Sequence, residues 1–172
     1  HRLAGHTDFR IFELAIWLHS LAQSLVWVFI PIILLQIGYS IQNILVYYLI
    51  FNVIDVPLNF FVAYVMRKIG ARKVLIIGVV SVIGVFALLN VLPPANWTLL
   101  VILAALGAVY DTFFWISHIY IFTEINREKG LDLGATTGAL EAVRKLANII
   151  GPITGAVLLI VVGKSSLLIS SI

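Results

Sequence analysis

Five predominantly apolar runs dominate this chain, and each is long enough to cross a lipid bilayer as a helix. A spanning helix needs about 20 residues, because each residue advances it by about 1.5 Å across a core of about 30 Å. Helices also satisfy their own backbone polar groups, which lipid cannot do. The runs predict an all-α integral membrane protein, a single multi-helix transmembrane bundle over 1–172. Its expected spans are 9–37, 41–66, 74–92, 97–123 and 135–162, with the start of a sixth at 165–172 in a chain that we expect to continue.

The composition supports this class and excludes several others. Of 172 residues, 62% are hydrophobic and 11% are charged, whereas soluble domains are nearer half apolar and a quarter charged. The absence of cysteine excludes disulfides and thiolate metal sites. The chain also lacks a complete Gly-x-x-x-x-Gly-Lys-Ser/Thr phosphate loop and a His-Glu-x-x-His motif. We therefore expect neither enzyme activity nor a cofactor.

The cations are distributed unevenly about the spans, and this predicts the orientation. Cytoplasmic loops of membrane proteins carry an excess of Lys and Arg. Only Lys164 lies on one side of the expected bundle, and ten cations lie on the other: Arg2, Arg10, Arg67, Lys68, Arg72, Lys73, Arg127, Lys129, Arg144 and Lys145. We expect a multi-pass protein of the plasma (inner) membrane with a cytoplasmic N-terminus. Because the cations sit at the ends of spans, no nucleic-acid partner is expected.

Polar side chains divide the spans into two kinds. A charge at the bilayer centre costs about 2.5–3.5 kcal/mol even on a lenient scale, so such groups should face a shared interior or a hydrated cavity. The third span has only Ser81 and Asn90 and is expected to face lipid. The other four carry the remaining polar groups and should enclose a polar interior: His19, Gln23, Asn52, Asp55, Asn59, Asp111, His118, Glu141, Arg144, Lys145 and Asn148.

Two carboxyl groups are candidates for proton binding. Asp111 lies near the middle of the fourth span, and Asp55 lies within the second. Hydrocarbon favours the neutral form of a carboxyl group, so either can take up a proton as its access to water changes. The alternative is a structural role, in which Asp55 bonds to Asn52 and Asn59. Asp111 would then bond to Tyr110, to a hydroxyl or to a neighbouring helix.

Other side chains are candidates for contacts with a substrate. His19 and Gln23 are four residues apart on the first span, and Trp115 and His118 share a helix face with Asp111 at i, i+4 and i+7. The substrate-cavity candidates are His19, Gln23, Asn52, Trp115 and His118. His19 and His118 are alternatively satisfied interior residues, and Trp115 is alternatively an anchor at the membrane interface. A metal site is not expected, because about 10 Å of helix rise separates Asp111 from His118.

The segment 59–73 (NFFVAYVMRKIGARK) joins two spans through a short turn with four cations. It resembles the cytoplasmic signature of the major facilitator superfamily, Gly-x-Leu-x-Asp-Arg-x-Gly-Arg-Arg. Arg67 stands where that family has the Asp that helps to latch its two halves, and Ala63 stands where it has the first Gly. When Gly70 is set on the second Gly, the remaining fixed positions hold Val65, Lys68, Ala71 and Arg72.

The segment 147–156 (ANIIGPITGA) carries a second resemblance to the same superfamily. It is similar to the Gly-x-x-x-Gly-Pro-x-x-Gly-Gly element associated with drug and proton antiporters. Gly151, Pro152 and Gly155 are retained, and alanines replace the other two glycines. Small residues let helices approach closely, and proline permits a bend.

The order of the connections is the third resemblance: short outside, basic inside, short outside, and a longer polar segment inside at 124–134. Together these features resemble the amino-terminal six-helix half of a transporter with two bundles around a central cavity. The second bundle is expected from a C-terminal half or a second copy. The resemblance implies secondary active transport of a small solute by alternating access. We expect proton coupling, with a lean towards efflux or antiport. The alternative is a non-transporting membrane scaffold or sensor that retains the bundle.

Charged groups on the expected cytoplasmic side are candidates for gating. They are Arg67, Lys68 and Arg72, with Gly70 at the turn, and Glu141 and Arg144 in the fifth span. The corner cations are alternatively orientation determinants that meet anionic headgroups. Glu141 is alternatively one half of a structural ion pair with Lys145, at the favourable i, i+4 spacing.

Overall fold

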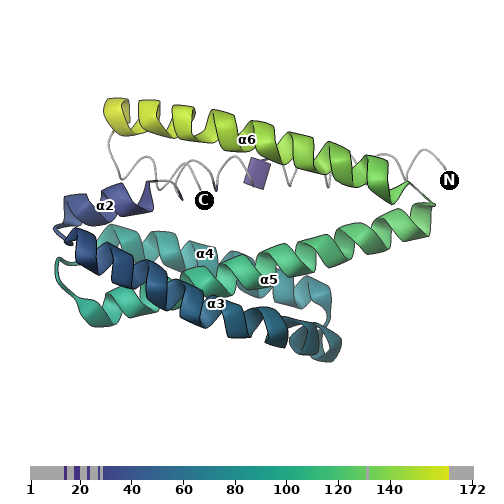
Figure 1. The fold of residues 1–172 in the computed structure, drawn as a ribbon, viewed down its shortest axis with the longest axis horizontal. Coiled ribbons are helices and arrows are strands. Elements are labelled where there is room, and N and C mark those ends of the chain that lie inside the picture. Colours follow the sequence, from purple (N-terminus) through teal and green to yellow (C-terminus); the bar gives the residue numbers. More distant parts are fainter. Residues whose placement is uncertain are drawn as a thin grey trace. The chain divides into compact units, whose positions relative to one another are not determined.

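The computed structural model is helical in the part of the chain that it describes, which is Leu14, Leu18, His19, Gln23, Trp27, 29–130 and 132–162. The helices are α2 (Ile30–Ile37), α3 (Ile41–Ile69), α4 (Ala71–Val91), α5 (Trp97–Lys129) and α6 (Leu133–Val162) (Figure 1). Among the described residues, three helices are long and apolar enough to cross a membrane: α3, α4 and residues Trp97–Glu128 of α5. The all-α prediction is confirmed. Most of the expected first span and all of 165–172 lie outside the described residues.

The chain forms two compact units, Pro31–Phe122 and His1–Ile30 with Thr123–Ile172, and each is described by itself. In the first unit, α3, α4 and α5 lie side by side (Figure 1). Val62 of α3, Val74 of α4 and Phe113 of α5 are buried together in one hydrophobic cluster. Three consecutive helices therefore share this core.

A single residue, Gly70, separates α3 from α4. Its φ of 89° is disfavoured for residues with a side chain, and its N–H donates to the Met66 carbonyl at 2.8 Å. The expected basic corner is therefore almost entirely helical, with Arg67 and Lys68 in the last turn of α3 and Arg72 in the first turn of α4. Cations are favourable at a helix C-terminus and unfavourable at its N-terminus. Helix stability therefore does not explain Arg72.

One side of α4 is buried and the other is exposed. The buried positions are three or four residues apart, as one side of a helix requires: Val74, Gly78, Val82, Val85 and Leu89. Ser81 donates to the Ile77 carbonyl at 2.9 Å. Asn90 donates to the Phe86 carbonyl at 3.0 Å. The two polar side chains of α4 are thus satisfied within their own helix.

Tyr39 ties the connection between α2 and α3 to the connection between α4 and α5. Its side chain is 2% exposed. The hydroxyl lies 3.0 Å from the Pro93 carbonyl and 3.1 Å from the Asn96 carbonyl, and it accepts from the Asn96 N–H at 3.1 Å. Asn96 also caps α5, because its side-chain oxygen accepts from the Leu99 N–H at 3.0 Å. One hydroxyl therefore holds two chain connections together.

Removal of this hydroxyl should loosen the connections. Tyr39→Phe keeps the buried ring but leaves backbone groups of Pro93 and Asn96 without this partner, which should cost about 1–3 kcal/mol. We expect a lower unfolding temperature in detergent and faster proteolysis between α4 and α5. Tyr64→Phe is the matched control, since the Tyr64 side chain is 53% exposed. Equal losses in the two variants would show that the Tyr39 hydroxyl has no special role.

The segment 124–134, expected as a connection, is mostly helical. α5 continues to Lys129, and α6 begins at Leu133. Asp132 caps α6, since its side-chain oxygen accepts from the Gly134 N–H at 2.9 Å. The Glu, Arg and Lys residues of this segment are good helix formers. Its polarity therefore marks the end of the apolar run and not the end of the helix.

Candidate functional site

The side chain of Asp55 links α3 to α5. It is partly buried, and its Oδ1 accepts a hydrogen bond of 2.5 Å from the Thr112 hydroxyl of α5. Its Oδ2 accepts from Asn59 Nδ2 at 2.9 Å, and the same amide nitrogen donates to the Asp55 backbone carbonyl at 2.8 Å. Each carboxyl oxygen therefore has a donor, one from each helix.

The polar network expected around Asp55 is only partly formed. Asn59 bonds to Asp55, whereas Asn52 is exposed and donates to the Tyr48 backbone carbonyl at 2.7 Å. Sequence reasoning did not identify Thr112, whose side chain is 2% exposed. The sequence shows Thr112 only as a hydroxyl within an apolar run. The group with which this hydroxyl pairs depends on how α3 and α5 are rotated against each other.

Aromatic rings gather around the substrate-cavity candidates of α5. The Phe114 ring lies edge to face with Trp115 at 5.4 Å and stacks on His118 at 5.9 Å. The rings of Trp115 and His118 meet edge to face at 5.7 Å. His118 is 1% exposed, and Trp115 and Asp111 are partly buried. Two of the three residues expected on one face of this helix are thus in direct contact.

His19 and Gln23, the candidates in the expected first span, are helical and partly buried. They belong to the unit formed by His1–Ile30 with Thr123–Ile172. Their expected approach to the groups on α3 and α5 stays a prediction.

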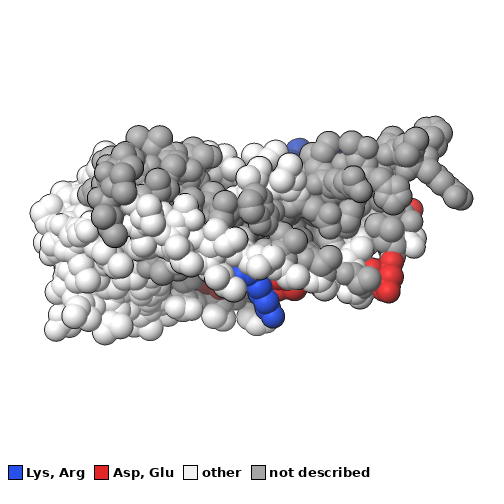
Figure 2. Space-filling model, turned by 90° about the horizontal axis from the view of Figure 1, so that it is seen from above, with Lys and Arg blue, Asp and Glu red and all other residues white. Residues whose placement is uncertain are grey.

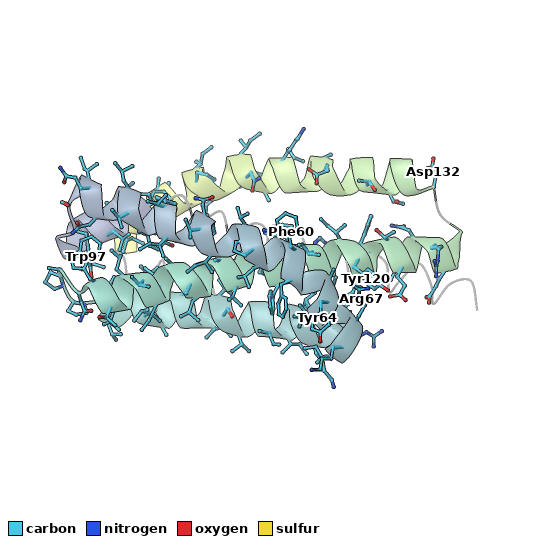
Figure 3. The ribbon with its side chains drawn as sticks, turned by 60° about the horizontal axis from the view of Figure 1, so that its bottom comes forward. Phe60, Tyr64, Arg67, Trp97, Tyr120 and Asp132 are labelled. Carbon is cyan, nitrogen blue, oxygen red and sulfur yellow. The ribbon has the colours of Figure 1, made fainter. Side chains whose placement is uncertain are left out.

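The basic end of α3 is exposed and follows an aromatic surface. Phe60, Tyr64 and Arg67 succeed each other along α3, while Trp97 lies at the other end of this unit (Figure 3). Phe60 is 83% exposed and Tyr64 is 53% exposed. Arg67 Nε donates to the Ala63 carbonyl at 3.4 Å, so its side chain folds back along the helix. The other corner candidates are also exposed: Lys68, Gly70 and Arg72.

α6 carries the remaining gating candidates. Glu141 is partly buried and Lys145 is exposed. The side chain of Arg144 lies outside the described residues. The pairing of Glu141 with Lys145 stays a prediction.

One side of α6 is built from small buried residues. Ala147, Gly151 and Gly155 follow at intervals of four and are buried, which suits close packing between helices. Pro152 is partly buried and lies inside the helix.

The described surface is largely apolar. On the face shown in Figure 2, uncharged residues cover most of the described surface, and few charged side chains interrupt them. Along α3, Leu45, Leu49 and Val53 are 64%, 62% and 63% exposed. Apolar exposure on this scale suits lipid or another protein surface better than water. Among the described residues, no three His, Cys, Asp or Glu side chains gather as a metal site would require.

A comparison with protein families accounts for these features together. The model described as Major Facilitator Superfamily matches residues 13–172, nearly the whole chain. No curated protein and no solved structure gives a significant match. The family match confirms the resemblance to this superfamily, and it agrees with the candidate spans and the apolar surface. The chain therefore belongs to the major facilitator superfamily, a family of multi-pass membrane transporters and not of enzymes.

Proposed function

We propose that this protein moves a small solute across the membrane by alternating access and couples the movement to protons. The observation that carries the proposal is the partly buried carboxyl group of Asp55, the only acidic group of α3. An ionisable residue within a spanning helix is costly and is retained mainly for function. Asp111 on α5 is the second proposed proton carrier.

We assign contacts with the solute to the candidate residues His19, Gln23, Asn52, Trp115 and His118. The contact between Trp115 and His118 supports this assignment, since the pair offers an aromatic surface beside a hydrogen-bonding ring. The Gly-Pro element of α6 favours efflux in exchange for protons. A second bundle, from a C-terminal half or a second copy, would complete the cavity.

We assign gating and orientation to the exposed cations around Gly70. Arg72 lies in the first turn of α4, where the helix dipole disfavours a cation. Its presence there supports a role in orientation. In this proposal the N-terminus and this corner lie in the cytoplasm, and the protein lies in the plasma membrane. Glu141 and Arg144 of α6 are the other proposed gating residues, and the buried side of α6 with Gly151, Pro152 and Gly155 is the proposed helix-packing surface.

A transport assay tests the proposal. The full-length protein, reconstituted into liposomes, should move at least one member of a panel of small solutes when a pH gradient is imposed. A proton ionophore should abolish this flux, and protein-free liposomes should not show it. Flux that persists unchanged after the gradient is collapsed would exclude proton coupling.

The second candidate is a non-transporting membrane scaffold or sensor. The bonds that occupy both carboxyl oxygens of Asp55 favour it, because a purely structural acid would be satisfied in this way. This candidate predicts no flux for any solute of the panel, together with specific binding of another membrane protein. The liposome assay therefore separates the two candidates.

A further inference from the structure

Thr112 uses its hydroxyl differently from three other hydroxyl side chains on these helices. Ser81, Thr136 and Thr154 each donate to the carbonyl four residues earlier, at 2.9 Å. That local bond is a common choice for Ser and Thr within a helix. Thr112 donates instead to Asp55 on another helix, from a side chain that is 2% exposed. Thr112 therefore makes its bond across helices and not within its own helix.

The two donors on Asp55 respond differently to a proton. The amide nitrogen of Asn59 can only donate, and its second bond to the Asp55 backbone carbonyl holds it in place. A hydroxyl both donates and accepts. When a proton from water binds to Oδ1 of Asp55, Thr112 can turn and accept a hydrogen bond from it. Its own hydrogen is then free for the carbonyl four residues earlier on α5.

We propose that Thr112 is the positioning residue of this proton site: its hydroxyl holds the Asp55 carboxyl group between α3 and α5, as donor to the carboxylate and as acceptor from the protonated form. The inference rests on the proposed role of Asp55 as a proton carrier. Within two helical turns of these two side chains, the other ionisable groups are Tyr48 on α3 and Tyr110, Asp111 and His118 on α5. Neither α2 nor residues 74–91 of α4 carry any.

The test is a pH titration of the reconstituted full-length protein by infrared difference spectroscopy. The stretching band of the protonated carboxyl group is assigned to Asp55 by its loss in Asp55→Asn. Bands lost in Asp111→Asn are set aside. Thr112→Val keeps the shape of the side chain and removes the hydroxyl, and Thr112→Ser keeps the hydroxyl. If Thr112→Val does not fold, as judged by thermal unfolding, Thr112→Ala replaces it.

We expect the band of the protonated Asp55 carboxyl group to shift in frequency in Thr112→Val, since its hydrogen bond to the Thr112 hydroxyl is lost. Thr112→Ser should stay close to the parent protein. A purely structural role for Thr112 would lower the unfolding temperature without moving this band, and an unmoved band overturns the inference while leaving Asp55 a proton site. If no band is assignable to Asp55, the proposed role of Asp55 as a proton carrier is wrong, and this inference is wrong as well.

Discussion

Asp55→Asn is expected to abolish accumulation of solute against its gradient while leaving downhill movement in place. The amide keeps the shape of the carboxyl group and can still accept from Thr112, but it cannot carry a proton. A gradient of one pH unit is worth about 1.4 kcal/mol per proton, which supports about tenfold accumulation when one proton moves per solute. The variant should approach equal concentrations on the two sides.

The measurement is the steady-state ratio of internal to external solute in liposomes, together with the rate of solute exchange without a pH gradient. Asn90→Ala is the matched control, because Asn90 is a polar residue of α4 whose side chain bonds only within its own helix in the structure. Accumulation that survives in Asp55→Asn would remove Asp55 from the coupling mechanism. Loss of solute exchange as well would indicate that Asp55 is needed for the structure of the helix bundle.

Gly78→Ala is expected to destabilise the unit formed by α3, α4 and α5. A Cβ atom at Gly78 would lie 2.8 Å from the backbone nitrogen of Phe114 and 3.2 Å from its Cα. Backbone atoms cannot turn aside as a side chain can, so α4 and α5 would have to separate. Overpacking of this kind costs about 1–3 kcal/mol. Because the Phe114 ring contacts Trp115 and His118, the proposed solute site should be displaced as well.

Thermal unfolding in detergent measures the loss of stability, and Gly84→Ala is the control variant on the same helix. A Cβ atom at Gly84 would meet only the tip of the Leu106 side chain, with Cδ1 at 3.3 Å, and this side chain can move. Alanine also favours the helix by about 1 kcal/mol over glycine. Gly84→Ala should therefore be neutral or stabilising. Similar unfolding temperatures for the two variants would contradict the close approach of α4 and α5 at Gly78.

The helical class and the family were predictable from the sequence, because lipid leaves an apolar chain few ways to satisfy its backbone. The corner around Gly70 and the Gly-Pro element were sufficient to suggest the family, which the match over 13–172 confirms. The helix ends were less predictable. Charged residues at 124–129 and around Gly70 lie outside the apolar runs but inside helices, since hydropathy reports the preferred solvent of a residue and not its backbone conformation.

The partners of the polar groups were the least predictable part. Helical spacing correctly grouped Asp55 with Asn59, because both lie on one helix and local geometry decides their contact. Helical spacing did not reveal Thr112, since a contact between two helices depends on their relative rotation and on their shift along the helix axis. The same spacing placed Asn52 beside Asp55, but Asn52 donates instead to a backbone carbonyl of its own helix.

The single-residue corner at Gly70 also has a consequence for how the protein enters the membrane. Only one residue separates α3 from α4, and such a short connection favours insertion of the two helices as a pair. We expect them to insert as a hairpin that keeps Arg67, Lys68, Arg72 and Lys73 together at one surface of the membrane. A change in the charge of this cluster should then affect the insertion of both helices.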